Sequence, residues 1–259
     1  MKVGGYRMSG IKDEFPSLPE SISGLGDLAY NLWWGWHPEG RELFMLLDRR
    51  AWDLSGHNPV KMLKLLDETD LASASTDLHF LRHYDAMMAR LQKDMDISHG
   101  WFCANVADPK DLIIAYFSAE YGLHQALPVY AGGLGFLAGD YLKECSDLGL
   151  PVVGIGFMYP EGYLLQQISS DGWQVGACEL LDRGTAPILR ALDADGRPLH
   201  VEIPVLERPI YVEVWRVQVG RTDLYLMDTS VDANDPWDRS ISDRLYTGDN
   251  EQRLRQEIV

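Results

Sequence analysis

The chain has 259 residues, of which 46% are apolar and 24% charged, a composition typical of a folded globular protein with a sizeable core. The formal net charge of −16 repels nucleic-acid backbones and anionic membrane surfaces, so we expect neither as a partner. No stretch reaches the roughly 18 apolar residues of a membrane span, and no targeting segment begins the chain. The sequence therefore predicts a cytoplasmic protein.

The cysteines agree with a reducing compartment. Cys103, Cys145 and Cys178 form neither an even-numbered framework nor a CxxC motif. Cys145 lies in a helical pattern beside apolar positions, so we expect it to be a buried, inert thiol.

The region 21–100 is predicted to be helical, after a tail over residues 1–20 that is rich in Gly, Ser and Pro. Its apolar residues recur at spacings of three or four. The cluster of Trp33, Trp34 and Trp36 on one such face favours core packing over sugar stacking. The predicted helical segments are 25–36, 39–47, 60–66 and about 76–95.

Residues 101–259 are predicted to form a partial Rossmann-like domain. The run 112–117 is continuously apolar, which is the pattern of a strand covered on both faces, and 150–156 is a second such run. A helical pattern over 136–148 lies between them, behind a glycine-rich loop. This order of strand, glycine loop, helix and strand predicts a βαβ unit of a parallel sheet.

A small antiparallel meander is predicted at about 199–228, where turn signals separate three β-rich segments. Residues 241–259 return to a helical pattern without a stop signal, so we expect the chain to be truncated at 259 in the middle of an element. The expected fold class is α/β: a helical N-terminal region, a Rossmann-like parallel sheet and an antiparallel β excursion. The β-rich segments are 199–205, 210–219 and 223–227.

The loop Gly132-Gly133-Leu134-Gly135 stands at the start of the predicted helix. Glycine lets a backbone approach a ligand closely, and the free N–H groups of a first helical turn favour an anion. A phosphate is the expected guest. Tight packing of helix against strand, or a simple turn, is the alternative, because the glycines match neither GxGxxG nor the P-loop.

Other side chains carry weaker signals. Glu120 and Asp140 could form a carboxylate pair, although structural hydrogen bonds are the favoured interpretation. We expect Lys143 to be a solvated helix residue. The histidines show no metal-ligand spacing, so the sequence predicts no metal site. Three aromatic residues are expected to pack near the site: Tyr159, Tyr163 and Trp173.

Several short motifs follow one another along the chain: LAYNLWWGWHPE (28–39), HNP (57–59), YFSAEYG (116–122), AGGLGFLAGD (131–140), GIGFMYPEGY (154–163), DGWQ (171–174) and RLYTGDNEQR (244–253). Together they resemble the N-terminal portion of the α-glucan (glycogen and maltodextrin) phosphorylase family, in its shorter-chain bacterial and archaeal branch. The resemblance covers nearly the whole chain from about residue 18. His37 stands where that branch would have Asn.

The resemblance implies a two-domain glycosyltransferase of the GT-B type. Such an enzyme transfers a terminal α-1,4-linked glucose from a glucan to inorganic phosphate and forms glucose 1-phosphate. It implies pyridoxal phosphate in the complete enzyme, acting through its phosphate group. It also implies that Gly132, Gly133, Leu134 and Gly135 contact glucose or phosphate.

By the same resemblance, no catalytic residue is assignable in this chain. The cofactor lysine, the basic residues for substrate phosphate and a histidine of the catalytic centre are expected beyond Val259. The isolated chain should therefore be inactive and should not bind the cofactor covalently. Its implied partners are a missing C-terminal half, in cis or in trans, and further copies in a homo-oligomer.

Two rival functions remain open from the sequence. A nucleotide-sugar glucan synthase also carries a GGL segment, but the absence of a lysine shortly before Gly132 and the DGWQ motif argue against it. The other rival is a non-catalytic glucan-binding or split-enzyme subunit. We also expect an exposed apolar face where the missing half would pack, and therefore self-association or poor solubility of this chain.

Overall fold

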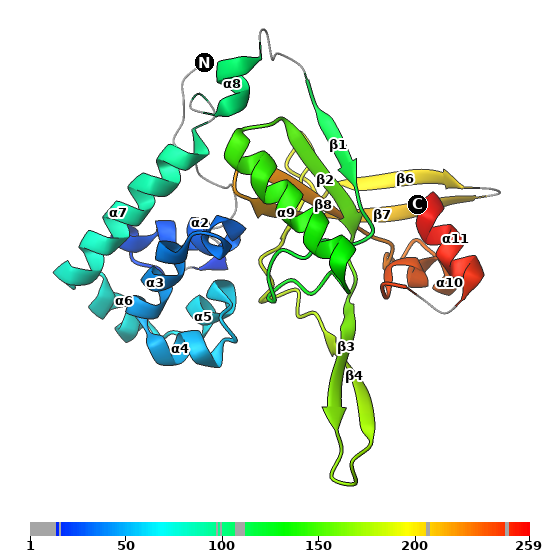
Figure 1. Ribbon diagram of the computed structural model, residues 1–259, viewed down its shortest axis with the longest axis horizontal. Coiled ribbons are helices and arrows are strands. Elements are labelled where there is room, and N and C mark those ends of the chain that lie inside the picture. Colours follow the sequence, from blue (N-terminus) through cyan, green and yellow to red (C-terminus); the bar gives the residue numbers. More distant parts are fainter. Residues whose placement is uncertain are drawn as a thin grey trace.

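The computed structural model describes residues 14–15, 17–96, 98, 100–106, 112–205, 208–246 and 249–259, so most of the predicted tail lies outside it. Figure 1 shows a group of helices on one side of a central sheet, with a long hairpin projecting from the sheet. No helix in the described ranges combines the length and the apolar composition needed to cross a bilayer.

The helical region is divided into short helices by Asp and Asn caps. The side chains of Asp48, Asn58, Asp67 and Asp77 each accept a hydrogen bond from a backbone N–H in the first turn that follows. The predicted helices over 39–47, 60–66 and 76–95 are confirmed, whereas α4 and α6 were not predicted. The helices are α2 (Gly24–Tyr30), α3 (Pro38–Leu47), α4 (Arg49–Leu54), α5 (Pro59–Leu65), α6 (Glu68–Ala74), α7 (Leu78–Met95) and α8 (Trp101–Asn105).

The predicted helix over 25–36 is interrupted at Asn31. Its backbone is extended, and its side chain accepts a hydrogen bond from the backbone N–H of Trp33, which starts the 3-10 helix η2 (Leu32–Gly35). The same side chain exchanges hydrogen bonds with the backbone of Gly220 at 2.8 and 3.1 Å, which ties the helices to the sheet. Trp33 and Trp34 are fully buried, as predicted for core residues.

The sheet confirms the predicted βαβ unit. Strands β1 (Ile114–Phe117) and β2 (Val152–Phe157) are parallel neighbours, and α9 (Gly133–Leu148) connects them. Beyond β2 the order continues through β8 (Thr222–Asp228) to β7 and β5, and β6 also pairs with β7.

The predicted meander is present as antiparallel β6, β7 and β8, yet it is not a separate excursion. Strand β8 pairs in parallel with β2, so the meander extends the parallel pair of β1 and β2 into one mixed sheet. Its remaining strands are β5 (Leu189–Arg190), β6 (His200–Val205) and β7 (Arg208–Val219).

One prediction about burial was wrong. The run 112–117 was expected to be covered on both faces, but β1 lies at the edge of the sheet and Phe117 is 70% exposed. Ile113 and Ile114 are exposed as well. A continuous apolar run indicates a strand that is buried on both faces, but it does not indicate which segment covers the strand. Strand β2, by contrast, is mostly buried as predicted.

A second, two-stranded sheet was not predicted. Strands β3 (Glu161–Ile168) and β4 (Gln174–Leu180) form the antiparallel hairpin that projects from the body in Figure 1. Trp173, at its turn, is 74% exposed and does not pack near the glycine loop as expected. Tyr159 is buried, while the side chains of Tyr163 and Cys178 lie outside the described ones. Cys145 is buried as predicted and Cys103 is exposed.

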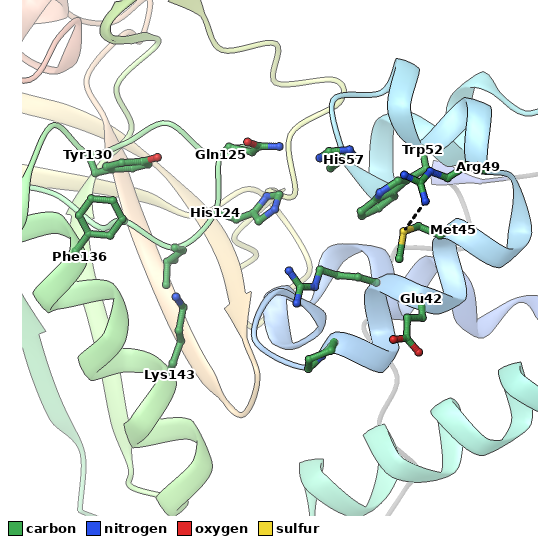
Figure 2. Close-up of a pocket in the computed structure, with 14 residues that line it drawn as sticks. Glu42, Met45, Arg49, Trp52, His57, His124, Gln125, Tyr130, Phe136 and Lys143 are labelled. Carbon is green, nitrogen blue, oxygen red and sulfur yellow. Dashed lines mark hydrogen bonds between the residues drawn. The ribbon is translucent and has the colours of Figure 1, made fainter.

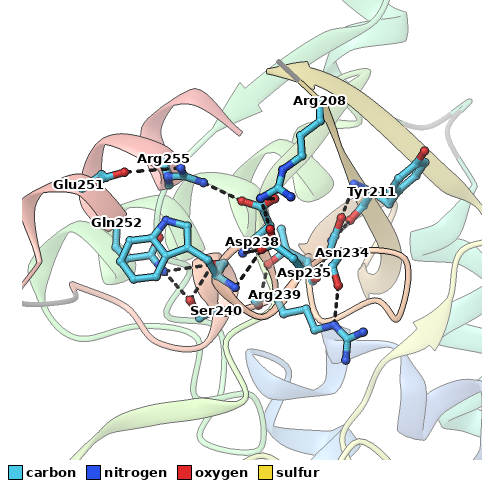
Figure 3. A network of polar contacts seen from close by, with 12 residues as sticks. Arg208, Tyr211, Asn234, Asp235, Asp238, Arg239, Ser240, Glu251, Gln252 and Arg255 are labelled. Carbon is cyan, nitrogen blue, oxygen red and sulfur yellow. Dashed lines mark hydrogen bonds and ion pairs between the residues drawn. The ribbon is translucent and has the colours of Figure 1, made fainter. Parts of the chain in front are cut away.

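The end of the chain is held by charged contacts around the buried Asp238, as Figure 3 shows. Its carboxylate lies 2.6 Å from Arg255 and 3.1 Å from Arg208. These contacts join β7 to two helices, and part of the predicted helical segment 241–259 is thus confirmed. The elements here are α10 (Pro236–Arg239), the 3-10 helix η4 (Ser240–Ser242) and α11 (Asn250–Ile258).

Candidate functional site

The glycine loop lies after the carboxyl end of β1 and forms the start of α9. Gly132 is the N-cap, so the helix begins at Gly133, three residues earlier than predicted. The first N–H groups of an α-helix have no partner within it. Among the described residues, the backbone amides of Gly133 and Leu134 have no hydrogen-bond acceptor, and both residues are exposed. Ligands of parallel α/β sheets bind at this edge.

Glu120 holds the loop in place. One carboxylate oxygen of this buried side chain accepts hydrogen bonds from the backbone N–H of Ala131 at 2.6 Å and of Gly132 at 3.0 Å. The other oxygen accepts a hydrogen bond from the hydroxyl of Tyr246 at 2.5 Å. Glu120 is therefore a structural group, as the sequence favoured. It does not pair with Asp140, which is exposed and forms an ion pair with Lys143.

The titration of this cluster follows from its contacts. Burial alone would raise the pKa of Glu120, but the hydrogen bonds from Tyr246 and from the loop amides outweigh it and lower the pKa. The pKa of Tyr246 is raised to about 12, mainly by its hydrogen bond to that carboxylate. At neutral pH the carboxylate is thus charged and the phenol is neutral.

Tyr246 also has an uncommon backbone conformation. Its φ of +55° lies in the left-handed region, which residues other than glycine seldom adopt. Such conformations persist where the surroundings enforce them, and they cluster at functional sites. Sequence reasoning did not find this residue, because its contact with Glu120 spans 126 residues.

The glycines of the loop have two different roles. A side chain at Gly135 would come within 2.6 Å of Tyr130 and 2.8 Å of the Glu120 carboxylate, so this glycine is required for packing. Around Gly132 and Gly133, in contrast, a Cβ would meet no described atom within 4 Å. Packing within this chain thus explains why position 135 is a glycine. The space beside Gly132 and Gly133 is open to a ligand.

The arrangement is suited to binding an anion. Two exposed amides of adjacent residues point from the N-terminal end of a 16-residue helix, where the helix dipole favours negative charge. The anchoring carboxylate already uses its oxygens on Ala131, Gly132 and Tyr246, so it fixes the loop while the next two amides stay available. No group of three His, Cys, Asp or Glu in the described parts of the chain is arranged to hold a metal ion.

The sequence of this chain is similar to those of known proteins. A family model described as a protein of unknown function (DUF3417) matches residues 18–127. Glycogen phosphorylase of Aquifex aeolicus is 44% identical over 239 residues, which are 91% of this chain and 33% of that protein. By sequence, this chain is thus homologous to part of a glycogen phosphorylase.

Two further relatives agree with this assignment. Maltodextrin phosphorylase of Thermococcus litoralis is 39% identical over 242 residues, and glycogen phosphorylase of Mycobacterium tuberculosis is 37% identical over 248 residues. Each match covers 93% of this chain and 29% of the relative. The chain thus spans about one third of the length of the phosphorylases it matches, as expected for an N-terminal portion.

Proposed function

We propose that this chain supplies the glycine-loop side of the active-site cleft of an α-glucan phosphorylase. The complete enzyme transfers a terminal α-1,4-linked glucose from a glucan to inorganic phosphate and releases glucose 1-phosphate. In this proposal the α/β part is one Rossmann-like half of a two-domain GT-B glycosyltransferase. The observation that carries it is the pair of exposed, unpartnered amides at Gly133 and Leu134 beside open space.

The loop contributes by holding negative charge. A phosphate oxygen placed against the amides of Gly133 and Leu134 replaces water by two fixed donors, which need no reorganisation during the reaction. Glu120 and Tyr246 hold the loop in the geometry that aims these donors. Positioning of this kind supplies a large part of the rate enhancement when two reactants must meet.

The family resemblance implies pyridoxal phosphate, and the described residues fit only the phosphate end of that group. The loop amides can receive a phosphate, whether from substrate or cofactor. The lysine of α9, Lys143, lies ten residues after Gly133, which is nearly three helical turns, so it offers no amine at the loop. When bound, the cofactor would supply an acidic, charge-stabilising phosphate. Its lysine and the remaining catalytic groups are proposed to lie outside this chain.

The relatives' names favour phosphorylase over the nucleotide-sugar synthase. The non-catalytic alternative is distinguished by experiment. Production of glucose 1-phosphate from maltodextrin and inorganic phosphate is measured with the polypeptide made from the complete reading frame and, separately, with this chain. We expect product from the first and none from the second. Retention on immobilised glycogen without product from either polypeptide would contradict the proposal and support a binding subunit.

A further inference from the structure

A cavity of about 610 Å³ lies between the helical region and the α/β part of the molecule, apart from the open space at Gly133. One wall is formed by α3 and α4, and the opposite wall by the segment 122–125 and by α9. Figure 2 shows the side chains of Arg49 and Trp52 on the first wall, with His124 and Lys143 facing them from the second.

Most of the titratable side chains in this lining are cationic or imidazole groups. Arg41, Arg49 and Lys143 face the cavity together with His57 and His124. Glu42 is the one carboxylate among the lining residues. In a chain with a net charge of −16, such a concentration of positive groups is not explained by composition. A concave site lined by one sign of charge attracts ligands of the opposite sign.

The cations are only partly neutralised by the protein. Arg41 is exposed and forms no ion pair or hydrogen bond with another described residue. Arg49 lies 3.2 Å from Asp53, and Lys143 lies 3.4 Å from Asp140, but neither aspartate lines the cavity. Lys143 is not the solvated residue that the sequence predicted, because its side chain is only 21% exposed.

The rings of the two histidines are held in place by their neighbours. The Nδ1 atom of His124 accepts a hydrogen bond from the backbone N–H of Ala126 at 3.1 Å, so its neutral ring carries the proton on Nε2. The ring packs edge-on against Trp34. His57 stacks on Trp52 and has a φ of +62°, the second left-handed residue other than glycine in the described chain. Strained conformations of this kind gather at ligand sites.

We propose that this cavity binds a small phosphorylated ligand, with the phosphate group held by Arg41, Arg49 and Lys143. Arg presents a planar fork that matches phosphate oxygens, and Lys adds a point charge. The exposed ring of Phe136, which packs edge-on against Tyr130, provides an apolar surface for the remainder of the ligand. This site is separate from the loop amides and does not depend on the proposed phosphorolysis.

The test uses nuclear magnetic resonance of the imidazole groups. Inorganic phosphate is titrated into the chain at constant ionic strength, with sulfate as a second tetrahedral dianion and succinate as a dicarboxylate. We expect a saturable shift of the His57 and His124 ring signals with phosphate and weaker binding of succinate. Chloride, titrated as a monovalent control anion, should give no saturable shift.

Matched variants distinguish a specific phosphate site from general electrostatic attraction. Arg41→Ala should weaken phosphate binding by about tenfold or more, because it removes a charge-assisted contact. Arg50→Ala removes the same charge from an exposed position that does not line the cavity, and it should leave binding unchanged. The Gly133→Pro variant should also leave the His124 shift unchanged.

The proposal is overturned by any of three results. The shifts do not saturate, succinate binds more tightly than phosphate, or Arg41→Ala and Arg50→Ala weaken binding equally. None of these results bears on glucose 1-phosphate formation, so failure here is distinguishable from failure of the proposed function.

Discussion

The carboxylate of Glu120 should control the stability of the glycine loop. Replacing Glu120 with Ala removes three hydrogen bonds, each worth about 1.5–3 kcal/mol when one partner is charged. Ala131 and Gly132 are only partly buried, so water replaces part of what is lost. We therefore expect the free energy of unfolding to fall by about 3 kcal/mol, and by about 1–2 kcal/mol in Glu120→Gln, which keeps the shape but not the charge.

The sign of the pH dependence follows from the lowered pKa of Glu120. A group whose pKa is lower in the folded state stabilises the fold above its unfolded pKa, and this contribution is lost as the pH falls through the folded pKa. The difference in the free energy of unfolding between the wild type and Glu120→Gln should therefore be largest at pH 7. It should decrease below about pH 4.5.

The assay is urea unfolding followed by tryptophan fluorescence at several pH values. Glu144→Gln, which removes a charge from an exposed position on α9, is the control and should change stability by less than about 0.5 kcal/mol. Equal stability of Glu120→Gln and the wild type at pH 7 would refute the anchoring role of Glu120. A difference in the free energy of unfolding that stays constant as the pH is lowered would also refute it.

Three further predictions concern other parts of the molecule. Burial, and then the charges of Lys143, His57 and Arg41, lower the pKa of His124 to about 4, so stability should fall by up to about 3 kcal/mol as the pH drops from 6.5 to 4. Urea unfolding of His124→Gln should lack this slope, and an unchanged slope would contradict the assignment. Phe117→Lys should reduce self-association and binding of an apolar dye, measured by light scattering and fluorescence, because it places a charge on the exposed edge strand. A Leu254→Lys variant with the same effect would show that β1 is not the cause. Asp238→Asn should lower stability by about 1–3 kcal/mol and speed hydrogen exchange in α11, whereas Asp232→Asn, at an exposed position, should do neither.

Local chemistry made most of the elements predictable. The helices over 39–47 and 60–66 follow from apolar spacing and from a proline at their first turn, and Asn58 caps the second. The short helices α4 and α6 were missed because six or seven residues carry too little periodicity. For the hairpin of β3 and β4, a turn signal did exist in Asp171-Gly172, where the glycine φ is +85°.

The candidate site was predictable only in part. The loop and its glycines could be located from the sequence, because a glycine cluster before a helix is recognisable from neighbouring residues alone. It did not predict which glycine serves packing, because Gly135 meets Tyr130 and Glu120 only after the chain has folded. It also misjudged Lys143, whose side chain faces helices about 100 residues earlier in the chain across the cavity. Contacts between segments that are far apart in the sequence cannot be recognised from any local sequence pattern.

The central claim is that the backbone amide at Gly133 binds phosphate in a phosphorylase. Gly133→Pro removes this one N–H at the first helical position, where proline is well accommodated, while Gly133→Ala keeps the N–H and fills open space. The decisive measurement is the rate of glucose 1-phosphate formation by both variants in the polypeptide from the complete reading frame. We predict that Gly133→Pro is at least about 100-fold slower than Gly133→Ala, the usual effect of losing one such donor. Equal rates of the two variants would contradict the claim.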